Sequence, residues 1–311
     1  MILREVLLEA GLVPPKNSDI DVSGISTVKY AGSDEIAIAF RNCDVSTAKT
    51  NIVLTDINLT ERDKLLIFPI TSVFESAVSI ARVFIRHGVY PDYNDIGSYK
   101  IDGNMVRWGE DCDIGYGTRI DSFSEIGSNV SIGNNTIIES NVYIGSGTVI
   151  GDNVIIRHGA RISSNPFNFY GETAYNNYPG IGNVVIGNNV IIGSNTVIQR
   201  GTFSDTVIES ETAIGDLVVI GHDVYIGHNC LIVSATGISG NVTIEDNVKI
   251  YGQCGVNNFV TIKKGAVIMG KSSVIKDIPA RSIISGNYGR THKDELRLQA
   301  KIRKLIKGDA I

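Results

Sequence analysis

A six-residue repeat runs through the middle and the C-terminal part of the chain. Aliphatic residues recur every six positions over 114–162, return in the same register over 186–198, and continue over 208–274 after a slip of four residues. Glycine often follows the aliphatic residue, and asparagine or aspartate often comes two or three places later, as in IGSNVS, IGNNTI and IGDNVI. A period this short and this regular is typical of a solenoid rather than of helical repeats or a β-sandwich.

The hexads predict a triangular coil of about 18 residues, in which each hexad supplies one side and one inward aliphatic residue. Glycine and asparagine at the corners supply backbone turns with positive φ at low steric cost. Each coil pairs with its neighbours, so no repeat is stable alone. We therefore expect a mainly β chain, built as a parallel β-helix over residues 105–285.

The flanking segments lack the repeat. Residues 1–104 are expected to form a small α/β domain, with a first helix ended by Gly11, strands in DIDVSGISTVKYAGSDEIAIAF and TNIVLTD, and a second helix ended by Gly88. Residues 286–311 are expected to form a C-terminal helix, HKDELRLQAKIRKLIK. Its predicted packed side carries Leu296, Ala300, Ile302 and Leu305. With six basic and two acidic residues over 293–307, this helix is interpreted either as a solenoid cap or as a contact for an acidic acyl carrier protein.

Two insertions interrupt the solenoid. The longer, 163–180, contains Phe167, Phe169, Tyr170, Tyr175 and Tyr178, and the shorter is RGTFSDT at 200–206. Long loops on a rigid scaffold are often functional. We expect the longer insertion to cover a substrate or a neighbouring subunit; the alternative is a tolerated surface loop.

Composition narrows the class of protein. The chain has 311 residues, 43% of them hydrophobic, and a net charge of −5, which gives no basic field for nucleic acid. The N-terminal stretch MILREVLLEAGLVPP does not resemble a signal peptide, and no apolar run approaches the roughly 20 residues of a membrane span. The four cysteines lack CxxC spacing. A cytoplasmic protein with no membrane span and no nucleic-acid partner is expected.

Two histidines stand in VVIGHDVYIGHNC, at positions 222 and 228. A six-residue offset places them on different sides of the coil, about 120° apart. Gly240 follows His222 by eighteen residues and is expected to stack on it. A neutral imidazole can accept the proton of an attacking amine, and an open backbone N–H can hold the oxyanion that forms from a thioester. The alternative is a solvated corner histidine.

The repeat resembles that of the hexapeptide-repeat acyltransferases, whose fold is a left-handed parallel β-helix. The whole layout looks like the UDP-3-O-acylglucosamine N-acyltransferase family of lipid A synthesis. AGSDEIAIAF, IQRGTFSDTVI, VVIGHDVYIGHN, GQCGVNNFVTI and MGKSSVIKDI resemble segments of that family. The resemblance implies that His222 is the general base and that the Gly240 N–H is the oxyanion donor. Asp216 or Asp223 is expected to orient the substrate or the imidazole.

The resemblance also implies a nucleotide-binding role for the N-terminal domain, through Phe40 and Asn42, and substrate contacts at Asn257 and Asn258. The sequence departs from the family here. Phe259 stands where the family has a second histidine, and no tyrosine completes the aromatic uracil clamp around Phe40. Uridine recognition is therefore left open.

The implied function is N-acyl transfer to the amine of a nucleotide-linked amino sugar, in lipopolysaccharide or surface-polysaccharide synthesis. The donor is a phosphopantetheine thioester, either acyl-CoA or an acyl carrier protein, with no metal and no bound cofactor. Its pantetheine arm is expected beside SATGISG and YGQCGVNN. The family implies a homotrimer with sites between subunits. Alternatives are acyl-CoA-dependent acylation of a nucleotide-linked dideoxyamino sugar, a zinc γ-carbonic anhydrase, which needs three histidines meeting across an interface, and a non-catalytic solenoid.

Overall fold

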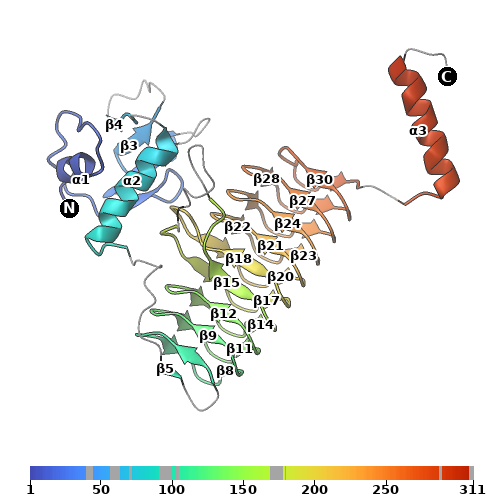
Figure 1. Ribbon diagram of the computed structural model, residues 1–311, viewed down its shortest axis with the longest axis horizontal. Coiled ribbons are helices and arrows are strands. Elements are labelled where there is room, and N and C mark those ends of the chain that lie inside the picture. Colours follow the sequence, from blue (N-terminus) through green and yellow to red (C-terminus); the bar gives the residue numbers. More distant parts are fainter. Residues whose placement is uncertain are drawn as a thin grey trace.

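The chain folds into a triangular β-solenoid, with a small α/β unit along one side and a helix beyond the last coil (Figure 1). The computed structural model describes residues 1–39, 45–56, 64–69, 72–90, 100–101, 105–168, 178, 180–286 and 289–307. The predicted fold class, a mainly β parallel solenoid with an α/β region before it and a helix after it, is confirmed.

The α/β unit is a parallel sheet, in the strand order β1–β2–β3–β4, with α2 packed on it. Its elements are α1 (Leu3–Glu9), β1 (Gly24–Thr27), β2 (Glu35–Ala39), a 3₁₀ turn (Val45–Thr47), β3 (Ile52–Thr55), β4 (Leu65–Ile67) and α2 (Val73–Arg86). The Ser72 hydroxyl caps α2 by accepting the Glu75 N–H at 3.1 Å. Gly11 and Gly88, with φ of 76° and 71°, follow the two helices as the sequence predicts. Strand β4 was not predicted.

Three sheets form the sides of the solenoid. The first holds β7 (Asp113–Ile114), β10 (Ser131–Ile132), β13 (Val149–Ile150), β16 (Val184–Ile186), β19 (Thr206–Ile208), β22 (Tyr225–Ile226), β25 (Thr243–Ile244) and β28 (Thr261–Ile262). The second holds β8 (Arg119–Ile120), β11 (Ile137–Ile138), β14 (Ile155–Ile156), β17 (Ile191–Ile192), β20 (Ala213–Ile214), β23 (Leu231–Ile232), β26 (Lys249–Ile250), β29 (Val267–Ile268) and β31 (Ile283–Ile284). The third holds β5 (Lys100–Ile101), β6 (Arg107–Trp108), β9 (Glu125–Ile126), β12 (Tyr143–Ile144), β15 (Arg161–Ser164), β18 (Val197–Gln199), β21 (Val219–Ile220), β24 (Gly237–Ile238), β27 (Gly255–Val256) and β30 (Ser273–Val274).

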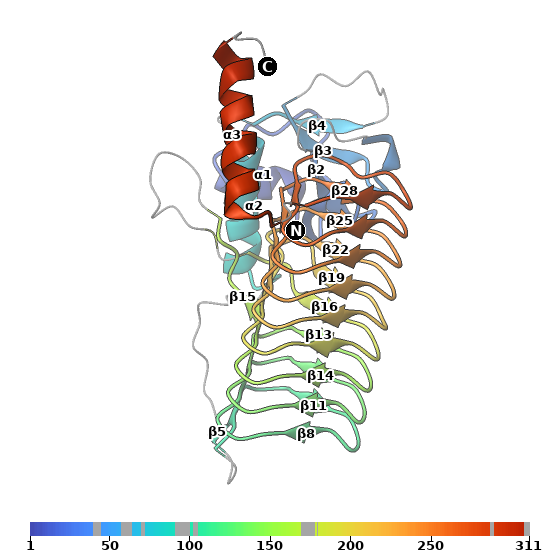
Figure 2. The same cartoon turned by 90° about the vertical axis from the view of Figure 1, so that its right-hand side faces the viewer.

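Successive coils are in parallel register and stack one above another, as Figure 2 shows. Where the solenoid is uninterrupted, partners are eighteen residues apart: Ile220 pairs with Ile238, and Ile238 pairs with Val256. Within the described strands only β5 runs antiparallel, against β6. The eighteen-residue coil expected from the repeat is therefore confirmed, and it determines which side chains stack.

Beyond the first coil, a hexad typically buries two side chains rather than the single one that the sequence predicts. Val224 and Ile226 are both fully buried, and Tyr225 between them points outward, because side chains alternate along a strand. Thr136 occupies the same inward position as Val224. Its hydroxyl donates to the Gly151 carbonyl at 3.0 Å and so is satisfied inside the core. The core of the solenoid is thus one continuous column of aliphatic residues with threonine and cysteine interspersed.

The corners turn through residues in the left-handed backbone region. Asn135, Asn189 and Asn241 have φ of 53°, 57° and 60°. Asparagine tolerates this region better than most residues, which explains its recurrence at the corners. Asp223 and Phe259 occupy the same kind of position, with φ of 56° and 60°.

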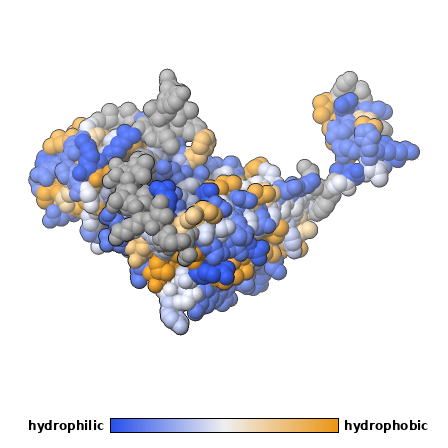
Figure 3. All heavy atoms as spheres, turned by 60° about the horizontal axis from the view of Figure 1, so that its bottom comes forward, coloured by the Kyte–Doolittle hydropathy of each residue, from blue (hydrophilic) through white to orange (hydrophobic). Residues whose placement is uncertain are grey.

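The C-terminal helix α3 (His292–Lys307) stands clear of the last coil in Figure 1. The side chains of Leu296 and Leu305 are 57% exposed and that of Ile302 is 39% exposed. The expected packing of these residues and Ala300 on the solenoid is wrong for the single chain, because all four side chains are exposed. On the face seen in Figure 3, apolar residues occur in small groups among polar ones. Among the described helices, none is long and apolar enough to cross a membrane.

Candidate active site

One edge of the solenoid carries the candidate site. We call it the His222 edge; it consists of the corners that follow strands of the third sheet. His222 lies in the corner after β21, and Gly240 lies in the corner after β24. The two insertions follow β15 and β18 of the same sheet, so they reach this edge as well. The spacing of eighteen therefore brings His222 and Gly240 together, as predicted.

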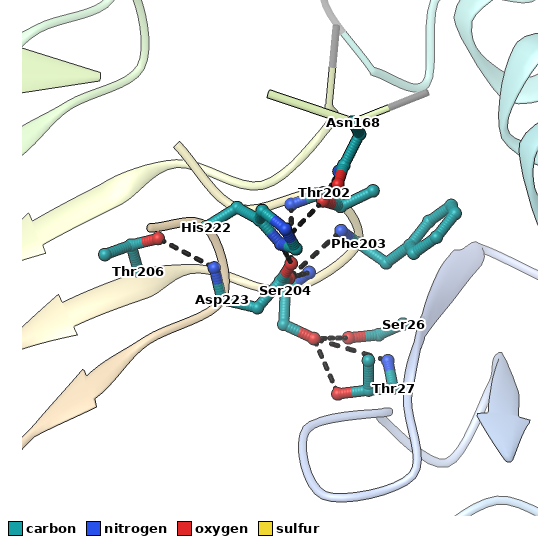
Figure 4. A network of polar contacts seen from close by, with 9 residues as sticks. All are labelled: Ser26, Thr27, Asn168, Thr202, Phe203, Ser204, Thr206, His222 and Asp223. Carbon is teal, nitrogen blue, oxygen red and sulfur yellow. Dashed lines mark hydrogen bonds and ion pairs between the residues drawn. The ribbon is translucent and has the colours of Figure 1, made fainter. Parts of the chain in front are cut away.

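Asp223 holds the imidazole of His222 in a fixed orientation (Figure 4). Its Oδ2 lies 2.7 Å from His222 Nδ1, and Thr202 Oγ1 lies 3.1 Å from the same nitrogen. The carboxylate also accepts three backbone N–H groups, from Thr202 at 3.0 Å, Phe203 at 3.2 Å and Ser204 at 2.9 Å. These bonds satisfy a charged group that is only 5% exposed. A proton on Nδ1 then bonds the carboxylate, which leaves Nε2 as the basic nitrogen of the ring.

Gly240 lies directly against that nitrogen. A Cβ atom built on Gly240 would be 2.4 Å from His222 Nε2, so only glycine leaves the ring its place. Within the described part of the chain the Gly240 N–H has no hydrogen-bond acceptor. At equivalent corner positions, the N–H groups of Asp216 and His228 each donate at 3.1 Å to a side chain of the next coil. The Gly240 N–H is therefore available to a ligand.

A cavity of about 180 Å³ lies over the His222 ring. Phe74 of α2, Phe203 of the shorter insertion and Phe259 supply apolar walls, while Asn168 and Asn258 supply amide groups. Its remaining lining residues are Thr27, Thr202, His222, Asp223, Gly240 and Asn241. The α/β unit and both insertions thus contribute to one enclosure, in which His222 is the basic group.

A wider groove of about 800 Å³ opens from the same place along the outer face of the third sheet. Gly237 and Gly255 stand at successive outward positions of β24 and β27, and a Cβ on either would meet nothing within 4 Å. The groove also reaches His222, Gly240 and Asn257. An extended ligand arm can therefore lie on bare backbone and end beside the imidazole.

The remaining sequence-predicted residues fall in different places. Asn257 lines the groove, and Asn258 lines both the groove and the cavity. Asp216 lies in the corner after β20, on another edge, where its carboxylate accepts the Ser194 N–H at 2.7 Å. Phe40 and Asn42 lie outside the described residues.

Two other histidines of the solenoid lie away from this edge. His228 follows β22 and lies 3.6 Å from a carboxylate oxygen of Glu209, and His158 follows β14 and bonds Ser140 and Glu139. His222 and His228 therefore do not converge within one chain, as their six-residue offset predicts.

Sequence reasoning missed the groups that hold the histidine–aspartate pair. Thr202 and the N–H groups of 202–204 belong to the insertion RGTFSDT, which has no periodicity from which to predict a contact. Asn168, from the longer insertion, donates its amide to Thr202 Oγ1 and lines the cavity over His222. The only signal in the sequence is that both insertions follow strands of one sheet.

Two tyrosines belong to the core of the α/β unit or pack against it: Tyr178 is fully buried, and Tyr90 is partly buried. Burial raises the pKa of Tyr178 and of Tyr90 well above the ordinary tyrosine value, so both phenols are neutral. Tyr90 donates to the Ile25 carbonyl at 3.1 Å, whereas the fully buried Tyr178 hydroxyl has no hydrogen-bond partner among the described residues. These residues act as packing groups, and His222 is the group suited to proton transfer.

Comparison with known proteins agrees with this architecture. Residues 129–164 match the family described as bacterial transferase hexapeptide (six repeats). A UDP-3-O-acylglucosamine N-acyltransferase of Methylobacterium sp. (strain 4-46) is 35% identical over 77 residues, which are 25% of this chain and 22% of that protein. An acyl-[acyl-carrier-protein]–UDP-N-acetylglucosamine O-acyltransferase of Nautilia profundicola is 40% identical over 62 residues, which are 20% of this chain and 24% of that protein.

A solved structure is also similar. The UDP-N-acetylglucosamine acyltransferase of Francisella novicida matches 64% of this chain and 73% of its own, at 29% identity and a TM-score of 0.52. The chain spans less than a quarter of the length of the two curated relatives. This chain therefore contains a stretch that matches the hexapeptide family, and it is similar to UDP-3-O-acylglucosamine N-acyltransferases in sequence and to a UDP-N-acetylglucosamine acyltransferase in fold.

Proposed function

We propose that this protein is an acyltransferase, which moves an acyl group from a pantetheine thioester to the amine of a nucleotide-linked amino sugar. The observation that carries the proposal is the His222–Asp223 pair, whose free Nε2 faces the Gly240 backbone inside an enclosed cavity. The likeness to acyltransferases named for UDP-linked glucosamine derivatives supports the same substrate class.

The residues support a direct transfer. The amine lone pair attacks the thioester carbonyl carbon, and the carbonyl electrons move to the oxygen, which the Gly240 N–H stabilises. His222 Nε2 accepts the amine proton, and the Asp223 carboxylate stabilises the imidazolium through Nδ1–H. The intermediate then collapses, the carbon–sulfur bond breaks, and the departing sulfur takes the proton from Nε2. An amide and a free thiol result, and the enzyme is regenerated without a covalent intermediate.

The donor is assigned to the groove along β21, β24 and β27. A pantetheine arm laid over Gly237 and Gly255 would place its thioester near the Gly240 N–H. Helix α3 carries six basic residues over 293–307 and is positioned to contact an acidic carrier protein beyond the last coil. Acyl carrier protein is therefore the proposed donor, with acyl-CoA as the alternative.

The acceptor amine distinguishes this proposal from a second candidate, transfer to a sugar hydroxyl. The second candidate is favoured by the likeness to a named O-acyltransferase and to the Francisella novicida structure. The departure at Phe259 keeps a dideoxyamino sugar as a third acceptor. By analogy with the family, the unit is a cytoplasmic homotrimer whose product enters lipopolysaccharide or surface-polysaccharide synthesis.

Turnover by the purified full chain tests the proposal. UDP-linked glucosamine derivatives, a nucleotide-linked dideoxyamino sugar and UDP-N-acetylglucosamine are each offered with acyl carrier protein and CoA thioesters, and the products are measured by mass spectrometry. We expect N-acylation, which His222→Ala lowers by about 10²-fold or more because it removes the general base. The matched variant His228→Ala, on another edge, should stay within about threefold of wild type. Turnover by His222→Ala within the same range would contradict the proposed mechanism.

A further inference from the structure

Ser204 joins the α/β unit to the histidine–aspartate pair. Its hydroxyl lies 2.7 Å from Thr27 Oγ1 and 3.1 Å from Ser26 Oγ, both at the end of β1, and the Thr27 N–H donates to it at 3.3 Å. The N–H of the same residue donates to Asp223 Oδ1 at 2.9 Å. Ser204 is only 5% exposed, so these bonds are shielded from competing water. A continuous chain of polar contacts therefore runs from β1 to His222 (Figure 4).

Packing fixes the same turn from a second side. The Phe203 ring is 4% exposed and stacks on Tyr178 with centroids 5.5 Å apart. It also meets Phe74 of α2 edge-on at 5.7 Å. Phe203 and Tyr178 belong to the buried core of the α/β unit, and Phe74 packs against that core. The backbone of the turn is thus held by the small unit as much as by the solenoid.

The solenoid anchors the start of the turn. Arg200 is 2% exposed; its Nε donates to the Gly182 carbonyl at 2.8 Å, and its Nη2 lies 3.3 Å from the Ser146 carbonyl oxygen. A Cβ on Gly201 would lie 1.4 Å from the Ser204 carbonyl oxygen, so the turn closes too tightly for any side chain there. The end of the turn is also fixed to the solenoid, because β19 begins at Thr206 and pairs with β16. The contacts of Phe203 and Ser204 with the small unit therefore fix the middle of the turn, which presents its N–H groups to Asp223.

We propose that the α/β unit positions the catalytic pair through Ser204, which is a positioning residue rather than a catalytic one. The contact of Ser204 with Thr27 fixes the turn 202–204, the turn fixes the Asp223 carboxylate, and the carboxylate fixes the His222 ring. The inference rests on the proposed function, and it gives the small unit a role in turnover that is separate from binding a nucleotide. Loss of the Ser204 hydroxyl should therefore lower kcat through the position of His222. The KM for the sugar should change little, because Ser204 is not among the residues that line the cavity over His222.

Ser204→Ala tests this directly in the full chain. We expect kcat to fall about tenfold and KM for the sugar to stay within about twofold, since an interaction that acts on the transition state alone lowers kcat and kcat/KM equally. The matched control is Ser124→Ala, which removes an equally buried hydroxyl that donates to the Glu139 carbonyl at 3.0 Å in a distant coil. The kcat of Ser124→Ala should stay within about twofold of wild type, even if its unfolding temperature falls as much as that of Ser204→Ala.

A double variant separates positioning from general loss of structure. In the His222→Ala background, Ser204→Ala should lower the residual rate by less than about twofold, because residues that act as a unit are not additive. Thr27→Val and Thr27→Ser test the other end of the contact and serve if Ser204→Ala does not fold. The valine variant should lose kcat, and the serine variant, which keeps the hydroxyl, should retain it.

Three results would overturn the positioning role: a wild-type kcat for both Ser204→Ala and Thr27→Val, an equal loss in Thr27→Ser, or an additive loss in the double variant. Failure of the proposed function is recognised separately: the wild-type chain would then show no N-acyl transfer, or His222→Ala alone would keep wild-type turnover.

Discussion

A methyl group at Gly240 should inactivate the enzyme without unfolding it. The Cβ of alanine at this position would lie 2.4 Å from Nε2, 2.5 Å from Cε1 and 2.9 Å from Cδ2 of His222. The Gly240 backbone is not in the left-handed region, so alanine adds no backbone strain. The three heavy atoms nearest to this Cβ all belong to the imidazole, and the Gly240 N–H itself is retained.

The size of the effect follows from the geometry. Ordinary contact begins near 3.4 Å, so the ring must withdraw by roughly 1 Å from a methyl group placed at 2.4 Å. The ring is held at Nδ1 by Asp223 at 2.7 Å and Thr202 at 3.1 Å, and such a shift breaks or bends both bonds. A misplacement of about 1 Å can cost about 10²-fold in rate. We expect kcat/KM to fall by at least that factor.

The assay is steady-state acyl transfer followed by mass spectrometry, with thermal unfolding measured on the same samples. Gly270→Ala is the matched control, because Gly270 holds the second position of a corner on another edge and its Cβ would meet the Gly252 carbonyl oxygen at 3.3 Å. The control should keep kcat/KM within about threefold. If folded Gly240→Ala also kept kcat/KM within that range, the ring would not need its place against this backbone, and the reasoning would be refuted.

Three further predictions concern single side chains. Asp223→Asn should lower kcat by about 10²-fold or more, because the neutral amide no longer stabilises the imidazolium. The control Asp152→Asn, in a distant coil, should leave kcat unchanged. Equal kcat values for the two variants would contradict the role of Asp223. Burial raises the pKa of Cys230 to about 11, so iodoacetamide at pH 8 should label this thiol only in denaturant. Labelling is mapped by mass spectrometry, and rapid labelling of the native chain would contradict the burial of the thiol. Phe259→Asn should keep or slightly raise the unfolding temperature, since asparagine tolerates the φ of 60° at this position. The same variant should raise KM for the sugar, because it removes an apolar wall of the cavity, and an unchanged KM would mean that the sugar binds elsewhere.

The repeat made much of this structure predictable. Inward residues every six positions and left-handed corners follow from local chemistry, and the coil length of eighteen is enough to place Gly240 on His222. The same arithmetic places Asp216 on another edge, because it precedes His222 by six residues, a third of a coil. The choice between Asp216 and Asp223 was left open by the resemblance, and the structure pairs Asp223 with the imidazole.

The rest depends on contacts between segments far apart in the chain. The turn that holds Asp223 is shaped by packing of Phe203 in the core of the α/β unit, and no spacing in the sequence indicates that contact. The amphipathic pattern of α3 predicts an apolar side but not the surface that covers it. The expected packing of Leu296 was therefore wrong for the single chain, in which this side chain is exposed. The sequence pattern predicts the strands and how their coils stack. The conformation of the insertions and the position of the terminal helix depend on tertiary packing, which the pattern does not indicate.

A crystal structure of the protein with its N-acylated sugar product bound tests the central claim most directly. The proposal requires the acylated nitrogen to lie about 2.6–3.2 Å from His222 Nε2, or to reach it through one water. It also requires the new carbonyl oxygen to lie within hydrogen-bond distance of the Gly240 N–H. A product seated elsewhere, with its amide more than about 6 Å from both groups, would contradict the assignment of this corner as the catalytic centre.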